Sequence, residues 1–177
     1  MATVLFVVPP ERFRDEELFD TRSVIEAAGY ESVVASTVAA VCPGSRGGNV
    51  ESVMTLDQVR TDDFLAVVFV GGGGSKLLYG DRQAHRIAQE AVTKNLVLGA
   101  ICLAPVILAN AGVLEGVRAT VAGTEAETLR QHGAVYTGPG VTVDGKVVTA
   151  NGPKSSSRFG DELVALVARH VPAAPIP

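Results

Sequence analysis

The amino-acid sequence predicts an α/β fold with a mostly parallel central sheet. Along the chain, short apolar runs rich in β-branched residues alternate with longer segments of helical periodicity. This order places helices over both faces of a parallel sheet. The composition agrees, because 47% of the 177 residues are apolar and only 19% are charged, which is typical of a folded chain. We expect one domain over residues 1–171 and a loose tail of proline and alanine over 172–177.

The expected strands are short apolar runs that suit buried positions in a parallel sheet. They are residues 3–8, 31–36, 65–70, 97–101 and 118–122. Residues 141–150 predict a hairpin, because Asp144-Gly145 is a strong two-residue turn signal. Residues 38–50 contain a proline and three glycines, and we expect an irregular loop or a small β excursion there.

The expected helices are segments whose apolar residues recur on one face. They are residues 13–28, 81–94, 104–111, 125–132 and 155–170. In the first of them Asp15, Glu16 and Glu17 load the first turn with negative charge, which the helix dipole favours. Ligands of such folds bind beyond the carboxyl ends of the strands, so the strand-to-helix corners are where a functional site is expected.

Charge and hydropathy argue against two classes of function. The net charge of −4 lacks the basic balance typical of nucleic-acid-binding proteins. Residues 96–114 carry no charge and are about as long as a bilayer span. Gly99, Pro105 and Gly112 interrupt this stretch, which indicates a buried strand followed by a buried helix. The N-terminus has no positively charged region, so we expect no signal peptide, no membrane span and a cytoplasmic location.

The cysteines and histidines predict neither a metal site nor a disulfide framework. Cys42 and Cys102 are too few for either, and we expect Cys42 to be a free thiol near a subunit interface. The histidines, His85, His132 and His170, all fall on expected helices. We expect them to be surface or capping residues.

Cys102 occupies the first of two notable corners. It directly follows the expected strand 97–101 and precedes the expected helix 104–111. A nucleophile between a strand and a helix, with small residues around the turn, has the geometry of a nucleophile elbow. The helix dipole and free N–H groups stabilise a thiolate at such a position, so we expect a lowered pKa for Cys102. The alternative is a buried core thiol.

The second corner is the run of four glycines, Gly71 to Gly74, that follows the expected strand 65–70. No Gly-Lys-Ser/Thr follows, so the run is not a phosphate-binding Walker loop. The match to a dinucleotide fingerprint is loose, and we expect no cofactor. Two interpretations stay open: a tight turn, or a set of exposed backbone N–H groups that hold an oxyanion.

Several segments together resemble the ThiJ/PfpI superfamily of class I glutamine amidotransferase-like proteins, over nearly the whole chain. They are residues 4–8 with 13–18, then 67–72, 100–114 and 148–156. The resemblance implies a flavodoxin-like three-layer sandwich, usually dimeric, with Cys102 as the reactive residue. It also implies that the N–H groups of Gly72 and Leu103, next to Gly71, form the oxyanion hole.

The chain departs from the family pattern at two positions. The protease-like branch has a histidine directly after the cysteine, and this chain has Leu103. The family also has a glutamate that touches the sulfur, and an ungapped alignment places Arg14 there. Because the preceding loop is one residue longer, Glu17, one turn beyond Arg14, is the first candidate and Glu16 the second. The alternative is that both glutamates are solvated carboxylates of a first helical turn.

These observations predict a Cys-dependent, cofactor-free enzyme of carbonyl or amide chemistry. Without a neighbouring histidine, peptide hydrolysis is disfavoured, because amide cleavage needs a proton for the leaving nitrogen. Attack of Cys102 on an aldehyde needs none, and Glu17 or Glu16 could shuttle the proton. Activities known for the family therefore imply a glyoxalase or deglycase acting on small 2-oxoaldehydes, as a homodimer. The alternatives are a redox sensor that uses an oxidisable cysteine and a stress chaperone in which Cys102 is idle.

Overall fold

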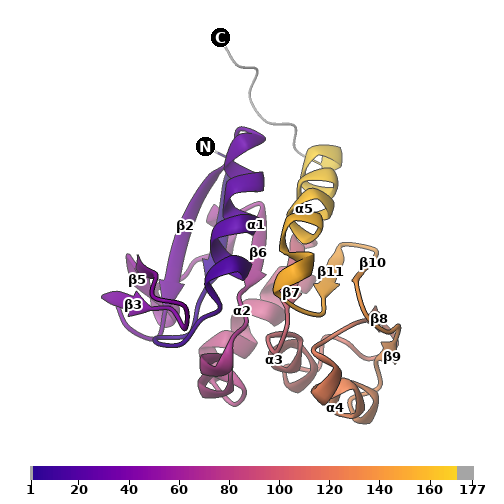
Figure 1. Cartoon of the computed structure of the whole chain (residues 1–177). Helices are drawn as coiled ribbons and strands as arrows, with labels where there is room; N and C mark the ends of the chain where they lie inside the picture. The colour runs from indigo at the N-terminus through magenta and orange to yellow at the C-terminus, as the bar shows by residue number, and fades with distance from the viewer. Residues whose placement is uncertain (1, 171–177) are drawn as a thin grey trace.

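The computed structural model describes residues 2–170, and the expected tail over 172–177 lies outside them. A seven-stranded sheet forms the centre of the fold (Figure 1). In spatial order its strands are β10 (Val141–Asp144), β11 (Val147–Ala150), β7 (Val97–Ile101), β6 (Ala66–Phe69), β1 (Thr3–Val7), β2 (Glu31–Ser36) and β5 (Met54–Thr55). All neighbours are parallel except β10 and β11, which form the expected hairpin. The prediction of a mostly parallel α/β sheet is confirmed.

Helices cover both faces of the sheet. They are α1 (Asp15–Ala27), α2 (Arg82–Thr93), α3 (Pro105–Asn110), α4 (Ala126–Gln131) and α5 (Ser156–His170). Short 3-10 helices lie in the segments that connect the strands and helices: η1 (Leu56–Gln58), η2 (Thr61–Asp63), η3 (Gly73–Leu78), η4 (Gly123–Glu125) and η5 (Pro153–Ser155). Two small sheets lie outside the central one: β3 (Val41–Pro43) with β4 (Asn49–Glu51), and β8 (Arg118–Ala119) with β9 (Val135–Tyr136).

The alternation of side chains along β1 produces the three layers. Val4 and Phe6 belong to one apolar core, under α1 and α5, which lie side by side in Figure 1. Leu5 and Val7 belong to the other, under α2 and α3. Successive side chains of a strand point to opposite faces, so a strand buried on both faces is apolar throughout. The layers are those of the flavodoxin-like sandwich that the resemblance implied.

The expected strand over residues 118–122 is only partly present. Its first two residues form β8, which pairs with β9 and does not join the central sheet. The next residues turn away, because their polar groups have other partners. The Thr120 N–H donates to Thr149 Oγ1 at 2.9 Å, and the Ala122 N–H donates to the Cys102 carbonyl at 2.8 Å. The segment therefore lies against the corner that holds Cys102.

Residues 38–50 form a hairpin, β3–β4, as the second expectation for this segment allowed. Its tip is held by Asp15 of α1, whose carboxylate accepts from the N–H groups of Arg46 at 2.9 Å and Gly48 at 2.7 Å. The uncharged stretch 96–114 divides into β7 and α3. No helix among residues 2–170 is long and apolar enough to cross a membrane.

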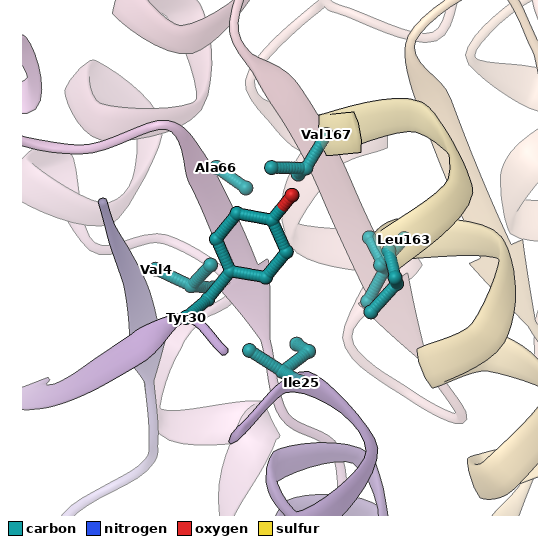
Figure 2. A pocket seen from close by; sticks show the side chains of 7 residues that line it. Val4, Ile25, Tyr30, Ala66, Leu163 and Val167 are labelled. Atoms are coloured by element: carbon teal, nitrogen blue, oxygen red, sulfur yellow. The ribbon is translucent and has the colours of Figure 1, made fainter. Parts of the chain in front are cut away.

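An apolar pocket lies at the end of the sheet where β1 and β6 begin (Figure 2). The Tyr30 ring stands between side chains of the two strands and of α1 and α5, among them Val4, Ala66, Ile25 and Leu163. None of these residues carries a charge or a nucleophile. The pocket is at the amino ends of the strands, opposite the carboxyl ends where chemistry is expected.

Candidate active site

Cys102 stands at the carboxyl edge of the sheet, between β7 and α3. Its backbone has φ 64°, in the left-handed region that non-glycine residues seldom adopt. Two hydrogen bonds hold the residue there: its N–H donates to the Ala150 carbonyl at 2.9 Å, and its carbonyl accepts from Ala122. A strained residue fixed from both sides is the geometry expected of a nucleophile elbow.

The Cys102 sulfur has three hydrogen-bond partners, which come from different parts of the chain. It accepts hydrogen bonds from the N–H groups of Gly72 and Leu103, and it shares one with the carboxyl group of Glu17. Glu17 is on the first turn of α1 and is fully buried. Its Oε2 accepts from the Gly71 N–H at 3.0 Å, while Oε1 has no hydrogen-bond partner among the described residues.

The glycine run allows this approach. A Cβ on Gly71 would lie 2.5 Å from Glu17 Oε2 and 2.8 Å from Cys102 Cβ, so a side chain has no space there. Gly72 has φ 107°, and a Cβ on it would lie 2.5 Å from the Arg12 carbonyl oxygen. The Arg14 N–H donates to the Gly71 carbonyl at 2.9 Å. The run is thus a turn against which the loop before α1 packs, and this packing brings Glu17 to the sulfur.

Glu17 and Cys102 shift each other's pKa. Burial raises the pKa of Glu17, against the hydrogen bonds from Cys102 and Gly71. Burial raises the pKa of Cys102 too, and the negative charge of Glu17 and their hydrogen bond raise it further, against the Gly72 and Leu103 N–H groups. The sequence-based expectation of a lowered Cys102 pKa is therefore wrong, because burial of the sulfur, followed by the charge of Glu17, outweighs the two N–H groups. Each charge disfavours the other, so the pair loses its two protons in separate steps.

The other expected residues lie apart from the sulfur. Glu16 turns outward and pairs with Arg14, with 2.5 Å between Oε2 and Nε. Among the histidines, His85 and His132 hydrogen-bond to the carbonyls of Tyr79 and Thr128. The geometry therefore distinguishes the two glutamate candidates: Glu17 contacts the thiol, whereas Glu16 carries a surface ion pair.

Cys42 is a free thiol, as expected, and is fully buried in β3. Its Sγ donates to the Ala40 carbonyl at 3.6 Å, and burial raises its pKa. A position near a subunit interface stays a prediction. Within residues 2–170, no group of histidine, cysteine and acidic side chains could hold a metal ion.

Two features of the structure were not predicted. An open hollow of about 260 Å³ is lined by residues 151–154, which follow β11 beside the Cys102 corner. The hydroxyl of Tyr79, just after η3, is buried without a hydrogen-bond partner among the described residues. No sequence motif marks Tyr79. Residues 151–154 lie within the segment 148–156 that carries the family resemblance, but the motif does not reveal a hollow, which depends on how distant segments meet.

A strained cysteine at a strand-to-helix corner, facing a buried carboxyl group, defines the class of α/β proteins with a cysteine elbow. The chain belongs to the DJ-1/PfpI family, which it matches over residues 2–166. This confirms the resemblance stated from its motifs. Among solved structures it is similar to a ThiJ/PfpI domain protein from Brachyspira murdochii, with a TM-score of 0.92, 32% identity, and coverage of 94% of this chain and 96% of that one.

The similar proteins include some with named activities. An uncharacterized protein of Methanocaldococcus jannaschii is 41% identical, over 96% of this chain and 84% of its own. The deglycase PfpI of Pyrococcus furiosus is 30% identical, over 93% and 98%. The glutathione-independent glyoxalase DJR-1.2 of Caenorhabditis elegans is 23% identical, over 92% and 87%.

Proposed function

We propose that this protein is a Cys102-dependent, cofactor-free enzyme that converts small 2-oxoaldehydes, or their adducts, in the manner of a glyoxalase or deglycase. The observation that carries the proposal is the hydrogen bond between the buried Glu17 carboxyl group and a sulfur that also accepts two backbone N–H groups. The deglycase and the glyoxalase among the similar proteins support the same substrate class.

The first step is addition of the sulfur to the aldehyde carbon of the substrate. The attacking form is the thiolate beside a protonated Glu17. An S–C bond forms, the aldehyde oxygen receives the Glu17 proton, and a hemithioacetal results. The Gly72 and Leu103 N–H groups stabilise the developing oxyanion, because the new oxygen lies next to the sulfur that they already contact.

The second step moves hydrogen between the two carbons. The Glu17 carboxylate removes the proton from the former aldehyde carbon, which leaves an enediolate, and returns it to the neighbouring carbon. The hydroxyl proton on the first oxygen passes to the second, and the first carbon becomes a thioester. Water hydrolyses the thioester, so methylglyoxal and water give lactate and regenerate the thiol. A glutamate with a raised pKa suits this exchange, because it both holds and releases a proton near neutral pH.

Peptide hydrolysis fits these residues less well. A protease must protonate the leaving amine, and the residue after Cys102 is leucine, not histidine. Glu17 is fully buried, so it is poorly placed to reach the leaving nitrogen of a bulky peptide. An aldehyde requires no protonated leaving group.

The test is turnover of methylglyoxal by purified protein, measured as lactate formed. We expect Cys102→Ser and Glu17→Gln each to reduce kcat at least about 10²-fold. Cys42→Ser is the matched control and should keep the wild-type rate. Turnover unchanged in Cys102→Ser would refute the proposal.

We further infer that the enzyme works as a homodimer in the cytoplasm. The described surface exposes three large apolar side chains around β3 and β5, Val38, Val41 and Val53, which a second copy could cover. Light scattering coupled to size-exclusion chromatography should give twice the chain mass of 18.3 kDa. A monomer at micromolar concentration would contradict this part of the proposal alone.

A further inference from the structure

The loop before α1 is held between two other parts of the chain. On one side, Arg12 and Phe13 form backbone hydrogen bonds of 2.8 Å to the β3–β4 hairpin, at residues 43 and 45. On the other side, Arg12 and Arg14 form backbone hydrogen bonds of 3.1 and 2.9 Å to the glycine run, at residues 74 and 71. Residues 12–14 therefore lie between the hairpin and the glycine run as a short central strand would.

Asp15, the first residue of α1, adds side-chain bonds on the hairpin side of this arrangement. Its Oδ1 accepts from the Arg46 N–H at 2.9 Å, and its Oδ2 accepts from the Gly48 N–H at 2.7 Å. Both carboxylate oxygens therefore bind backbone donors in the hairpin tip, which is residues 44–48. Hydrogen bonds to an ionised carboxylate are shorter and stronger than those between neutral groups, so this pair of bonds fixes the first turn of α1 against the hairpin.

Two glycines of the hairpin tip make the space that the Asp15 carboxylate occupies. A Cβ on Gly44 would overlap Asp15 Oδ1. A Cβ on Gly48 would lie 2.5 Å from Asp15 Oδ2 and 2.9 Å from Phe19 Cε2. Neither glycine has a positive φ, so the backbone conformation does not require glycine at these positions. The space that the carboxylate takes up does require it.

Glu17 stands two residues after Asp15, on the same first turn, and its place beside Cys102 is unfavourable by itself. Its carboxyl group is fully buried, and Oε1 has no hydrogen-bond partner among residues 2–170. A buried carboxyl group with an unfilled oxygen is more stable when it moves toward water. The rest of the chain therefore has to hold this turn in place. The bonds of residues 12–15 to the hairpin and the glycine run supply that restraint.

We propose that Asp15 is a positioning residue, whose bonds to the tip of the β3–β4 hairpin hold Glu17 in hydrogen-bond contact with the Cys102 sulfur. The inference rests on the proposed function where it concerns turnover, and it makes the hairpin a support of the same site. Asp15 bonds to the hairpin and acts on the sulfur only through the first turn of α1. Displacing a catalytic group by about 1 Å can reduce a rate about 10²-fold. A small change at the hairpin tip should therefore be measurable at Cys102.

The first test is Gly48→Ala, which displaces the Asp15 carboxylate and leaves every charged residue in the chain. The measurement is the rate of Cys102 alkylation by iodoacetamide as a function of pH, in a Cys42→Ser background. We expect the midpoint of this profile to move to lower pH. The reason is that a Glu17 carboxylate that has moved away from the sulfur no longer opposes the thiolate.

Turnover is the second readout of the same variant. We expect kcat for methylglyoxal to fall roughly 10- to 10²-fold in Gly48→Ala, with KM little changed. Gly47→Ala is the matched control in the same tip. It strains the backbone, because Gly47 has φ 91°, but its Cβ would meet no atom within 4 Å. It should lower the melting temperature and leave both the alkylation midpoint and kcat unchanged. The charged neighbours of the site, Arg14 and Glu16, are the same in both variants.

Asp15→Asn tests the carboxylate directly. Asparagine has the same shape, but its amide nitrogen is a donor and cannot accept one of the two N–H groups of the hairpin tip. We expect the same shift of the alkylation midpoint as in Gly48→Ala. In a Glu17→Gln background, neither variant should move the midpoint further, because a positioning residue acts only through the residue that it positions. A residue that only stabilised the fold would lower the melting temperature and leave the midpoint of the folded protein unchanged.

The outcomes separate this inference from the proposed function. A folded Gly48→Ala or Asp15→Asn protein that keeps the wild-type alkylation midpoint would overturn the role of Asp15 and leave the function of Cys102 standing. Failure of the function itself would appear as unchanged turnover in Cys102→Ser, or as no turnover by the wild type. Alkylation needs no turnover, so its midpoint decides the role of Asp15 in either case. Circular dichroism identifies which of the two variants is folded at the assay temperature, and that variant gives the result.

Discussion

Replacing Glu17 by glutamine should lower the pKa of Cys102. Glutamine keeps the size of the side chain but removes the negative charge, one of the causes that raise this pKa. Two unit charges about 4 Å apart interact by about 4 kcal/mol at an effective dielectric constant of about 20, which corresponds to roughly 3 pKa units. Cys102 is partly exposed, so solvent reduces the effect, and we expect a decrease of about 1–3 units.

The assay is the rate of Cys102 alkylation by iodoacetamide as a function of pH, in a Cys42→Ser background. The midpoint of the rate profile should move to lower pH in Glu17→Gln. Glu16→Gln is a matched control, because Glu16 is on the same helical turn but pairs with Arg14 on the surface, and it should shift the midpoint by well under one unit. A Glu17→Gln profile that superimposes on the wild type, or moves to higher pH, would refute the reasoning.

Further predictions concern stability. Burial raises the folded-state pKa of Glu17 from 4.5 to about 8, so between these pH values the folded state binds more protons than the unfolded state. The melting temperature should therefore fall as the pH rises from 5 to 8. In Glu17→Gln the melting temperature should depend less on pH over this range. Gly71→Ala should lower the free energy of unfolding in urea by about 1–3 kcal/mol, since the new Cβ would lie 2.5 Å from Glu17 Oε2. An unchanged midpoint of the urea transition would contradict this close packing. Asp15→Ala should cost about 1–3 kcal/mol through its lost hydrogen bonds to Arg46 and Gly48, and proteolysis should then begin in residues 44–48.

The sequence predicted those parts of the fold that depend on local pattern. Residues 31–36 and 97–101 form strands with the expected bounds, because an apolar run between turn signals suffices to define a buried strand. β5 and β9 have two residues each, too few for any periodicity to show. Residues 120–122 have the composition of a strand, but their hydrogen bonds go to Thr149 and Cys102, partners that only the folded chain supplies.

The assignment of Glu17 shows how much an alignment register can decide. An ungapped comparison favoured Arg14, and the extra residue of the preceding loop favoured Glu17. In the structure Arg12 adopts φ 55°, a left-handed turn, and its N–H and carbonyl are bonded to Pro43 and Gly74. This turn takes up length in the loop, so that Glu17 is the residue that reaches the sulfur.

The ionisation of Cys102 could not be deduced from the elbow motif, and comparing magnitudes explains why. A helix N-terminus stabilises a nearby negative charge by about 0.3–1 kcal/mol, and α3 has only six residues. A carboxylate in contact with the sulfur opposes the thiolate by up to about 4 kcal/mol at an effective dielectric constant of about 20. Burial of the sulfur is the largest cause that opposes the thiolate, and the charge of Glu17 adds to it, so together they outweigh the effect of the helix terminus. Reactivity of the thiol should therefore follow the protonation of Glu17, and the alkylation profile of Glu17→Gln measures that dependence directly.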